Sequence, residues 1–221
     1  MDHNSGFGRL AGWAGLAGAL LVGVAEFLIQ FNTAGGYERA GYEYFQQISS
    51  ERLTLGYYLA VLSAPLYIVG YWFLERLLLP SGRALAAAFF LIGAYAFAIG
   101  AVWLGERAFL AFTVQAISEG AASPELLHRM ASYNEPLVNV LRVAMVAVSV
   151  LWVVLILRGR TALPKWMAIF NPATILASIF ALYWAAPSVG VYILPVAMNV
   201  THVIIFGLAL MTCSKTASHA H

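Results

Sequence analysis

Four charged side chains fall inside stretches of this sequence that are otherwise apolar. Glu106 and Arg107 stand side by side in an aromatic-rich run, and Glu26 and Arg142 each interrupt a further apolar run. Ionisable groups are costly in a bilayer, so they usually face the protein interior and mark a functional site. Carboxylates in such a place could donate, accept or relay protons.

The composition predicts that these charges sit in a membrane protein. The chain is 62% hydrophobic and 10% charged, whereas soluble domains are roughly 45–50% apolar and about 25% charged. A net charge of +2 without a basic cluster gives no reason to expect a nucleic-acid partner. The lipid bilayer is the expected surrounding, and the sequence gives no indication of the oligomeric state.

Six apolar segments predict an all-α, polytopic bundle of six transmembrane helices in a single domain. The charge-free stretch 166–213 is too long for one crossing and is divided at the turn signal 187–190. Pro136 suits the first turn of a helix, so the polar residues before it, 113–135, are predicted to form a loop. Within this loop, Ser123-Pro124-Glu125-Leu126 is typical of the start of a short helix. The predicted helices cover residues 7–31, 53–79, 84–112, 136–158, 165–186 and 191–213.

The basic residues favour one orientation. If the N-terminus is inside, seven of the twelve Lys and Arg residues fall in inner segments, three in outer loops and two within helices. Short cytoplasmic segments are enriched in Lys and Arg. Both termini are therefore expected in the cytoplasm.

In this orientation the charged residues share a layer. Glu26, Arg107 and Arg142, with Glu106, lie roughly 8–10 Å below the outer face at about 1.5 Å per helical residue. Asn139 is expected above Arg142, and Asn199 and His202 a little deeper. Aromatic side chains, among them Tyr57 and Trp103, fall at similar depth.

Two interpretations of this layer remain open. Two carboxylates and two guanidinium groups balance in charge, as a buried salt-bridge network that fixes helices requires. Alternatively, the groups line a cavity that opens outward and holds a small hydrophobic ligand. In that case Glu26 or Glu106 would exchange a proton, Arg107 would act as counter-ion, and Asn199 and His202 would orient or polarise the substrate. The candidate catalytic residues are Glu26, Glu106 and His202, and the candidate binding residues are Tyr57, Trp103, Arg107, Asn139, Arg142 and Asn199.

Three functions fit these features. The first is a membrane-embedded enzyme with isomerase- or cyclase-like acid/base chemistry on a small lipid-like or isoprenoid substrate. The second is a proton-coupled transporter or channel component in which Glu26 and His202 relay protons. The third is a non-catalytic accessory subunit. No cofactor or metal is expected, because the sequence has no nucleotide-binding, hydrolase or zinc-protease motif and no Cys/His cluster.

Four features of the sequence can be compared with known families. They are the glycine-rich run from Arg9-Leu10-Ala11-Gly12-Trp13 to Glu26, the segment from Arg52 to Gly56, the segment from Pro65-Leu66-Tyr67 to Gly70-Tyr71, and Asn199. With these features, the layout of nearly the whole chain resembles that of an uncharacterised family of bacterial membrane proteins with six helices and about this length. That resemblance implies a multi-pass protein of a cell membrane, by expectation a bacterial inner membrane, and implies no activity.

Overall fold

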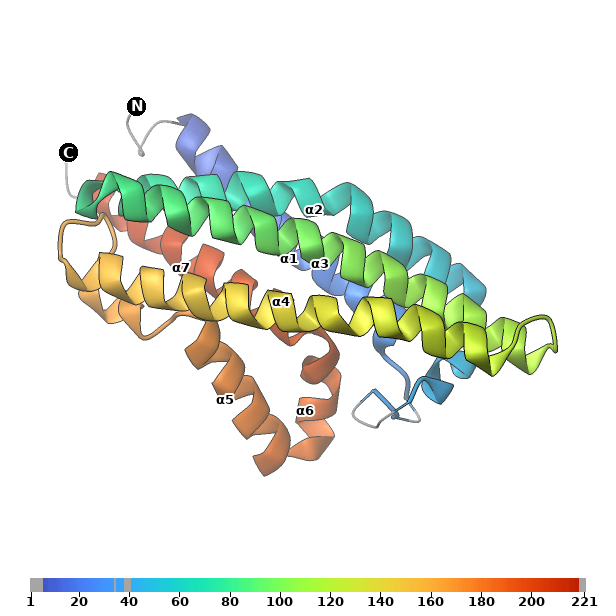
Figure 1. Ribbon diagram of the computed structural model, residues 1–221. Helices are drawn as coiled ribbons and strands as arrows, with labels where there is room; N and C mark the ends of the chain where they lie inside the picture. The colour runs from blue at the N-terminus through green and yellow to red at the C-terminus, as the bar shows by residue number, and fades with distance from the viewer. Residues whose placement is uncertain (1–5, 34, 38–40, 219–221) are drawn as a thin grey trace.

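The computed structural model describes residues 6–33, 35–37 and 41–218 (Figure 1). Within these ranges the chain is all-α and has no strand, which confirms the predicted fold class. The α-helices are α1 (Gly6–Gln30), α2 (Ser50–Leu78), α3 (Arg83–Ser118), α4 (Pro124–Leu157), α5 (Pro172–Ala185), α6 (Pro187–Ile193) and α7 (Ala197–Ser218), and the 3-10 turns are η1 (Glu43–Gln47), η2 (Leu79–Ser81), η3 (Lys165–Ala168) and η4 (Leu194–Val196).

Five helical segments of the described chain are long and apolar enough to cross a membrane. They are Phe7–Gln30, Ser50–Ser81, Arg83–Ser118, Pro124–Leu157 and Pro187–Cys213. The prediction of one continuous helix over 165–186 is wrong, because η3 and a break precede α5. Asn171 caps α5 by accepting a hydrogen bond from the Thr174 N–H. The remaining 14 residues measure about 21 Å, less than the hydrocarbon core of about 30 Å.

The outer ends of α3 and α4 extend much further than the sequence suggested. The prediction of a loop over 113–135 is wrong, since α3 continues to Ser118 and α4 begins at Pro124, which leaves Pro136 inside α4. Ser123 caps α4 by accepting from the Leu126 N–H, and Gly120 turns the chain with a φ of 75°. At 36 and 34 residues, the two helices are about 54 and 51 Å long and must project beyond the hydrocarbon core.

The helices pack in a row from α7 through α1, α2 and α3 to α4, and α5 contacts both α4 and α7. The contact between α1 and α2 is the most extensive, and their backbones approach closely, since a Cβ added to Gly15 would lie 2.6 Å from the Gly70 Cα. Small residues allow such backbone approach in membrane bundles. Figure 1 shows α5 and α6 leaving this bundle as a hairpin, and the tip of this hairpin lies well away from the α3–α4 turn.

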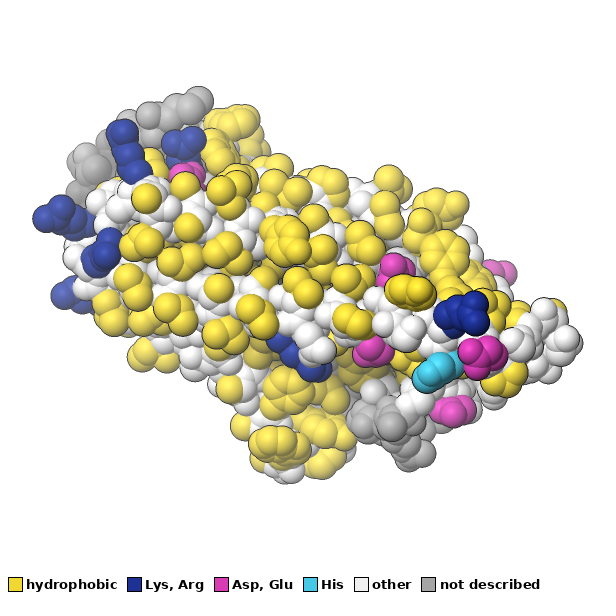
Figure 2. Space-filling model, in the orientation of Figure 1, with side chains coloured by type: hydrophobic (Ala, Val, Ile, Leu, Met, Phe, Trp, Pro, Cys, Tyr) yellow, Lys and Arg dark blue, Asp and Glu magenta, His cyan; other side chains and the backbone are white. Residues whose placement is uncertain are grey.

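Charge is distributed unevenly along the bundle. Figure 1 places both termini at one end, and Figure 2 shows that dark-blue Lys and Arg side chains gather there. Most acidic side chains lie at the opposite end, and apolar side chains cover the surface between the two ends (Figure 2). This pattern is typical of a bundle whose middle faces lipid.

Candidate functional site

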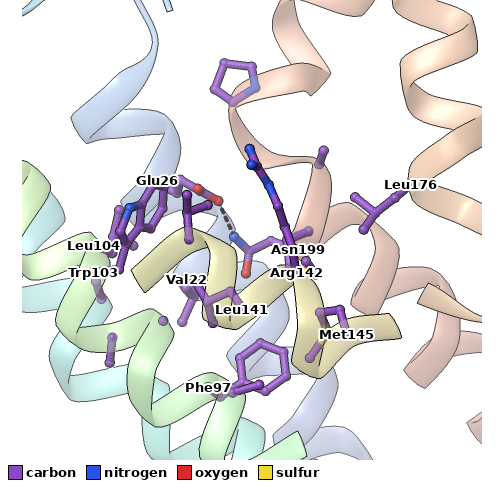
Figure 3. Close-up of a pocket in the computed structure, with 18 of the residues that line it drawn as sticks. Val22, Glu26, Phe97, Trp103, Leu104, Leu141, Arg142, Met145, Leu176 and Asn199 are labelled. Atoms are coloured by element: carbon purple, nitrogen blue, oxygen red, sulfur yellow. Dashed lines mark hydrogen bonds between the residues drawn. The ribbon is translucent and has the colours of Figure 1, made fainter. Parts of the chain in front are cut away.

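A cavity of about 230 Å³ lies near the middle of the bundle, where the α5–α6 hairpin diverges from α4. Every long helix contributes to its wall. The lining is mostly apolar, as for Val22, Phe97 and Met145, and Figure 3 shows these side chains around the space. The polar lining comes from Glu26, Tyr37, Tyr67, Trp103, Arg142 and Asn199.

Glu26 is the centre of a hydrogen-bonded set within this wall. Its side chain is buried, and each carboxylate oxygen accepts one amide hydrogen bond: Gln30 Nε2 donates to Oε1 at 2.8 Å and Asn199 Nδ2 donates to Oε2 at 2.6 Å. The Tyr67 hydroxyl in turn donates to Asn199 Oδ1 at 2.6 Å. Three helices, α1, α2 and α7, thus fix the orientation of one carboxylate.

The local sequence explains how these groups meet. Gln30 follows Glu26 by four residues, so both lie on one face of α1. Gly23 is one turn earlier on that face, and a Cβ there would lie 3.1 Å from the Asn199 Cβ. A larger residue at this position would push α7 away from α1. Glycine at position 23 therefore keeps Asn199 within reach of Glu26.

Arg142 faces the same cavity from α4, and none of the described salt bridges gives it a carboxylate partner. Its side chain is exposed, and within the described part of the chain its guanidinium has one hydrogen bond, from Nη1 to Asn139 Oδ1 at 3.1 Å. The described salt bridges do not include it. Figure 3 shows its side chain extending beside Asn199 along the cavity.

Helix lengths place Glu26 and Arg142 at a similar depth. Counted from the basic end, Glu26 is 17 residues beyond Arg9 and Arg142 is 16 residues from Arg158, which corresponds to about 25 and 24 Å. Glu106 is 23 residues beyond Arg83, or about 34 Å. By this count Glu106 lies about 9 Å further from the basic end than Glu26, and the expected common layer stays a prediction.

His202 belongs to a second buried pair, one turn along α7 from Asn199. Its Nε2 lies 2.9 Å from the Tyr71 hydroxyl and its Nδ1 lies 2.7 Å from the Met198 carbonyl oxygen. The rings of Phe97 and Phe206 pack around it, with centroids 4.8 and 6.2 Å away. His202 is fully buried and does not line the cavity.

Arg107 is enclosed at the outer end by residues that sequence reasoning did not assign to it. Its Nη1 donates to Glu135 Oε1 at 2.9 Å and its Nη2 to the Tyr44 hydroxyl at 2.8 Å. Its guanidinium carbon also lies 5.4–5.5 Å from three aromatic ring centroids, at cation–π distance. Those rings belong to Tyr42, Phe45 and Trp103.

The two tyrosines of this cluster are neutral at physiological pH. Burial, followed by the hydrogen bond to Glu135, raises the pKa of Tyr42 to about 12. Burial outweighs the nearby Arg107 charge and raises the pKa of Tyr44 to about 12 as well. The outer cluster therefore consists of one cation, one anion and neutral phenols, so its charge is balanced.

Glu106 is half-buried and has a different partner from its neighbour. Asn134 Nδ2 donates to Glu106 Oε2 at 3.1 Å and to the Trp103 carbonyl oxygen at 3.0 Å. Both contacts tie α3 to the extended start of α4. Glu106 does not line the cavity.

The structure brings together four of the nine predicted site residues at the cavity: Glu26, Trp103, Arg142 and Asn199. Asn139 touches this group through Arg142, whereas Tyr57 packs against Phe109 and lies outside it. Arg107 and Glu106 belong to the outer end, and His202 to the deeper pair.

Sequence reasoning assigned no role to Tyr67, Tyr71 or Gln30. The two tyrosines are four residues apart on α2, and their partners Asn199 and His202 are three apart on α7. Matching spacings on two helices are the signal that could have identified the pairs. Across residues 6–33, 35–37 and 41–218, no group of three or more His, Cys, Asp or Glu side chains could hold a metal ion.

Comparison with known proteins identifies a family whose function is unknown. A model of a family of unknown function (DUF6796) matches residues 3–216, nearly the whole chain. No curated protein and no solved structure matches. The expected membership of an uncharacterised family is confirmed to this extent, and the chain belongs to this family of unknown function.

Proposed function

We propose that the protein is a membrane-embedded enzyme that performs acid/base chemistry at Glu26 on a small lipid-like substrate. The observation that carries this proposal is a single buried carboxylate, fixed by two amide donors, in the wall of a mostly apolar cavity. Ligand sites typically combine an apolar lining with a few placed polar groups. An apolar cavity among membrane helices suits a substrate that dissolves in lipid.

Glu26 rather than Glu106 takes the chemical role in this proposal, because Glu106 lies outside the cavity. In an isomerisation, the carboxylate would take a proton from one substrate carbon and return it to another. Such a step needs no external reactant. Asn199 and Gln30 would position the carboxylate, and Tyr67 would hold Asn199 in turn.

The proposed location is a cell membrane with both termini in the cytoplasm. Five long apolar helices support a multi-pass protein. The gathering of basic side chains at the end that holds both termini supports this orientation (Figure 2). The Glu26 cavity would then lie in the outer half of the bilayer.

The test is a comparison of lipid composition before and after exposure to the protein. Purified wild type, Glu26→Gln and Glu106→Gln would be reconstituted with a total bacterial lipid extract, and each lipid species followed by chromatography and mass spectrometry. Wild type and Glu106→Gln are expected to convert one species into an isomer. Glu26→Gln should convert it at least about 100-fold more slowly, the usual scale of a lost general acid or base.

Glu119→Gln is the matched control, since Glu119 is an exposed carboxylate at the end of α3. Size-exclusion profiles would show that each variant is folded. Conversion that survives in folded Glu26→Gln would overturn the assignment of Glu26. The absence of any conversion by wild type would overturn the enzyme function.

Proton-coupled transport is the second candidate, favoured by the polar residues that follow one another along α2 and α7. Tyr67 and Asn199 lie one turn from Tyr71 and His202. No hydrogen bond between the two described pairs continues this line, and Phe97 packs against both Tyr67 and His202. Solute-dependent proton uptake into liposomes would favour transport over catalysis.

A further inference from the structure

We propose that the cavity takes a single-chain amphiphile with an anionic head, a carboxylate or phosphate, that enters from the bilayer between α4 and α5 and pairs with Arg142. This inference rests on the proposed function and names its class of substrate. The amphiphile's apolar chain would occupy the lined space, and its head would lie at the side where Arg142 is exposed.

The first argument is the unmet charge of Arg142. A guanidinium group has five N–H donors, and among the described residues only Asn139 accepts from one of those of Arg142. The side chain lies within apolar α4, about 24 Å from the basic end. A cation at such depth needs an anion or water. Glu26 does not provide that anion, since their charged groups are not within 4.0 Å and both its oxygens accept other hydrogen bonds.

The second argument is the balance of donors and acceptors in the cavity wall. The Trp103 indole Nε1 is buried and has no hydrogen-bond partner in the described part of the chain. Like Arg142, it can only donate. Two acceptors of the wall, the Glu26 carboxylate and Asn199 Oδ1, are already engaged, and the Tyr67 hydroxyl donates its proton to Asn199. The unused donors of the wall therefore suit a ligand group that is rich in acceptors, and an anionic head is such a group.

The third argument is the place where the cavity meets the surface. Two of its lining residues are exposed large side chains: Arg142 on α4 and Phe180 on α5, which is 45% exposed. Figure 1 shows the hairpin of α5 and α6 diverging from α4 at this level. An opening between two lipid-facing helices admits molecules from the bilayer, so the occupant is expected to carry an apolar chain.

The experiment measures binding of radiolabelled dodecyl phosphate to the full chain in nanodiscs of zwitterionic lipid. Dodecanol and inorganic phosphate serve as competitors. Wild type is expected to bind the alkyl phosphate at least about tenfold more tightly than dodecanol, the scale of one charged hydrogen bond. Arg142→Gln should abolish this preference and leave dodecanol binding unchanged. Arg129→Gln is the control, because Arg129 is exposed on α4 outside the cavity.

Three results would overturn the inference. They are an intact preference in Arg142→Gln, an equal loss for both ligands in that variant, and displacement by inorganic phosphate at the same concentration as the alkyl phosphate. The last would assign the site to a free anion. Glu26→Gln is expected to keep dodecyl phosphate binding, so a failure of the catalytic proposal and a failure of this one give different results.

Discussion

Arg107 and Arg142 are two arginines on neighbouring helices with opposite surroundings. Arg107 has a carboxylate, a tyrosine hydroxyl and three aromatic rings around it. Arg142 has one amide oxygen and an open cavity. The first guanidinium is enclosed by the fold, and the second has donors to spare.

The difference separates the structural from the functional use of intramembrane charge. The outer cluster is balanced in charge and joins η1, α3 and α4. The cavity wall holds a carboxyl group, Glu26, and a guanidinium group, Arg142, that do not pair with each other. Under the proposed function, the unpaired groups at the cavity serve a ligand, whereas the paired charges of the outer cluster stabilise the fold.

The largest effect on stability is expected from Arg107→Met. This change keeps an unbranched side chain, although a shorter one, and removes both hydrogen bonds and the cation that the three rings surround. Losing two hydrogen bonds made by a charged group should lower the free energy of unfolding by on the order of 3 kcal/mol. Thermal unfolding in detergent would measure the loss. Arg129→Met should stay within about 0.5 kcal/mol of wild type, and an equal response of the two variants would remove the contrast.

A smaller loss is expected from Asn199→Ala. The substitution leaves the Tyr67 hydroxyl without its acceptor and one Glu26 oxygen without its donor. Unsatisfied buried polar groups cost about 1–3 kcal/mol, so an unfolding free energy lower by about 2 kcal/mol is expected from the same measurement. Asn139→Ala is the matched control, as that asparagine is exposed. Equal destabilisation by both changes would mean that the Glu26 set contributes nothing to the fold.

The smallest effect on stability is expected from Arg142→Gln. The side chain is exposed and unpaired with a carboxylate, so its removal should change the free energy of unfolding by no more than about 0.5 kcal/mol. The comparison with Arg107→Met would be made in the same detergent. If Arg142→Gln lowered the free energy of unfolding as much as Arg107→Met, Arg142 would be a structural residue, and the two regions would not differ in the way described.

The sequence predicted which segments form membrane helices better than it predicted the residues at which those helices begin and end. Apolar length alone identifies α1 and α2 and the spanning parts of α3 and α4. The extensions of α3 and α4 were predicted as a loop, because they contain charged residues such as Glu119, Glu125 and Arg129, which are common in loops. Polar residues also suit helices that stand in water, and the Ser123 cap marks where α4 really begins.

The sequence predicted several residues of the site, but not which side chains pair with each other. Depth counting brought Glu26 and Arg142 to one level and Asn199 a little deeper. It could not assign Arg107 to Glu135 and Tyr44, because that choice depends on η1 and on a turn of α4 that the sequence analysis treated as loop. Partner choice is a tertiary property, and helix periodicity gives only the face and the height of a residue.

The short α5 has a consequence for the lipid around it. Its length of about 21 Å is less than the hydrocarbon thickness of about 30 Å, so hydrophobic mismatch is expected beside α5, and a bilayer adapts to a short apolar segment by thinning. The thinned annulus would lie against the α4–α5 opening. Lipid headgroups there would descend toward the level of Arg142, which shortens the path that a charged head must travel through hydrocarbon.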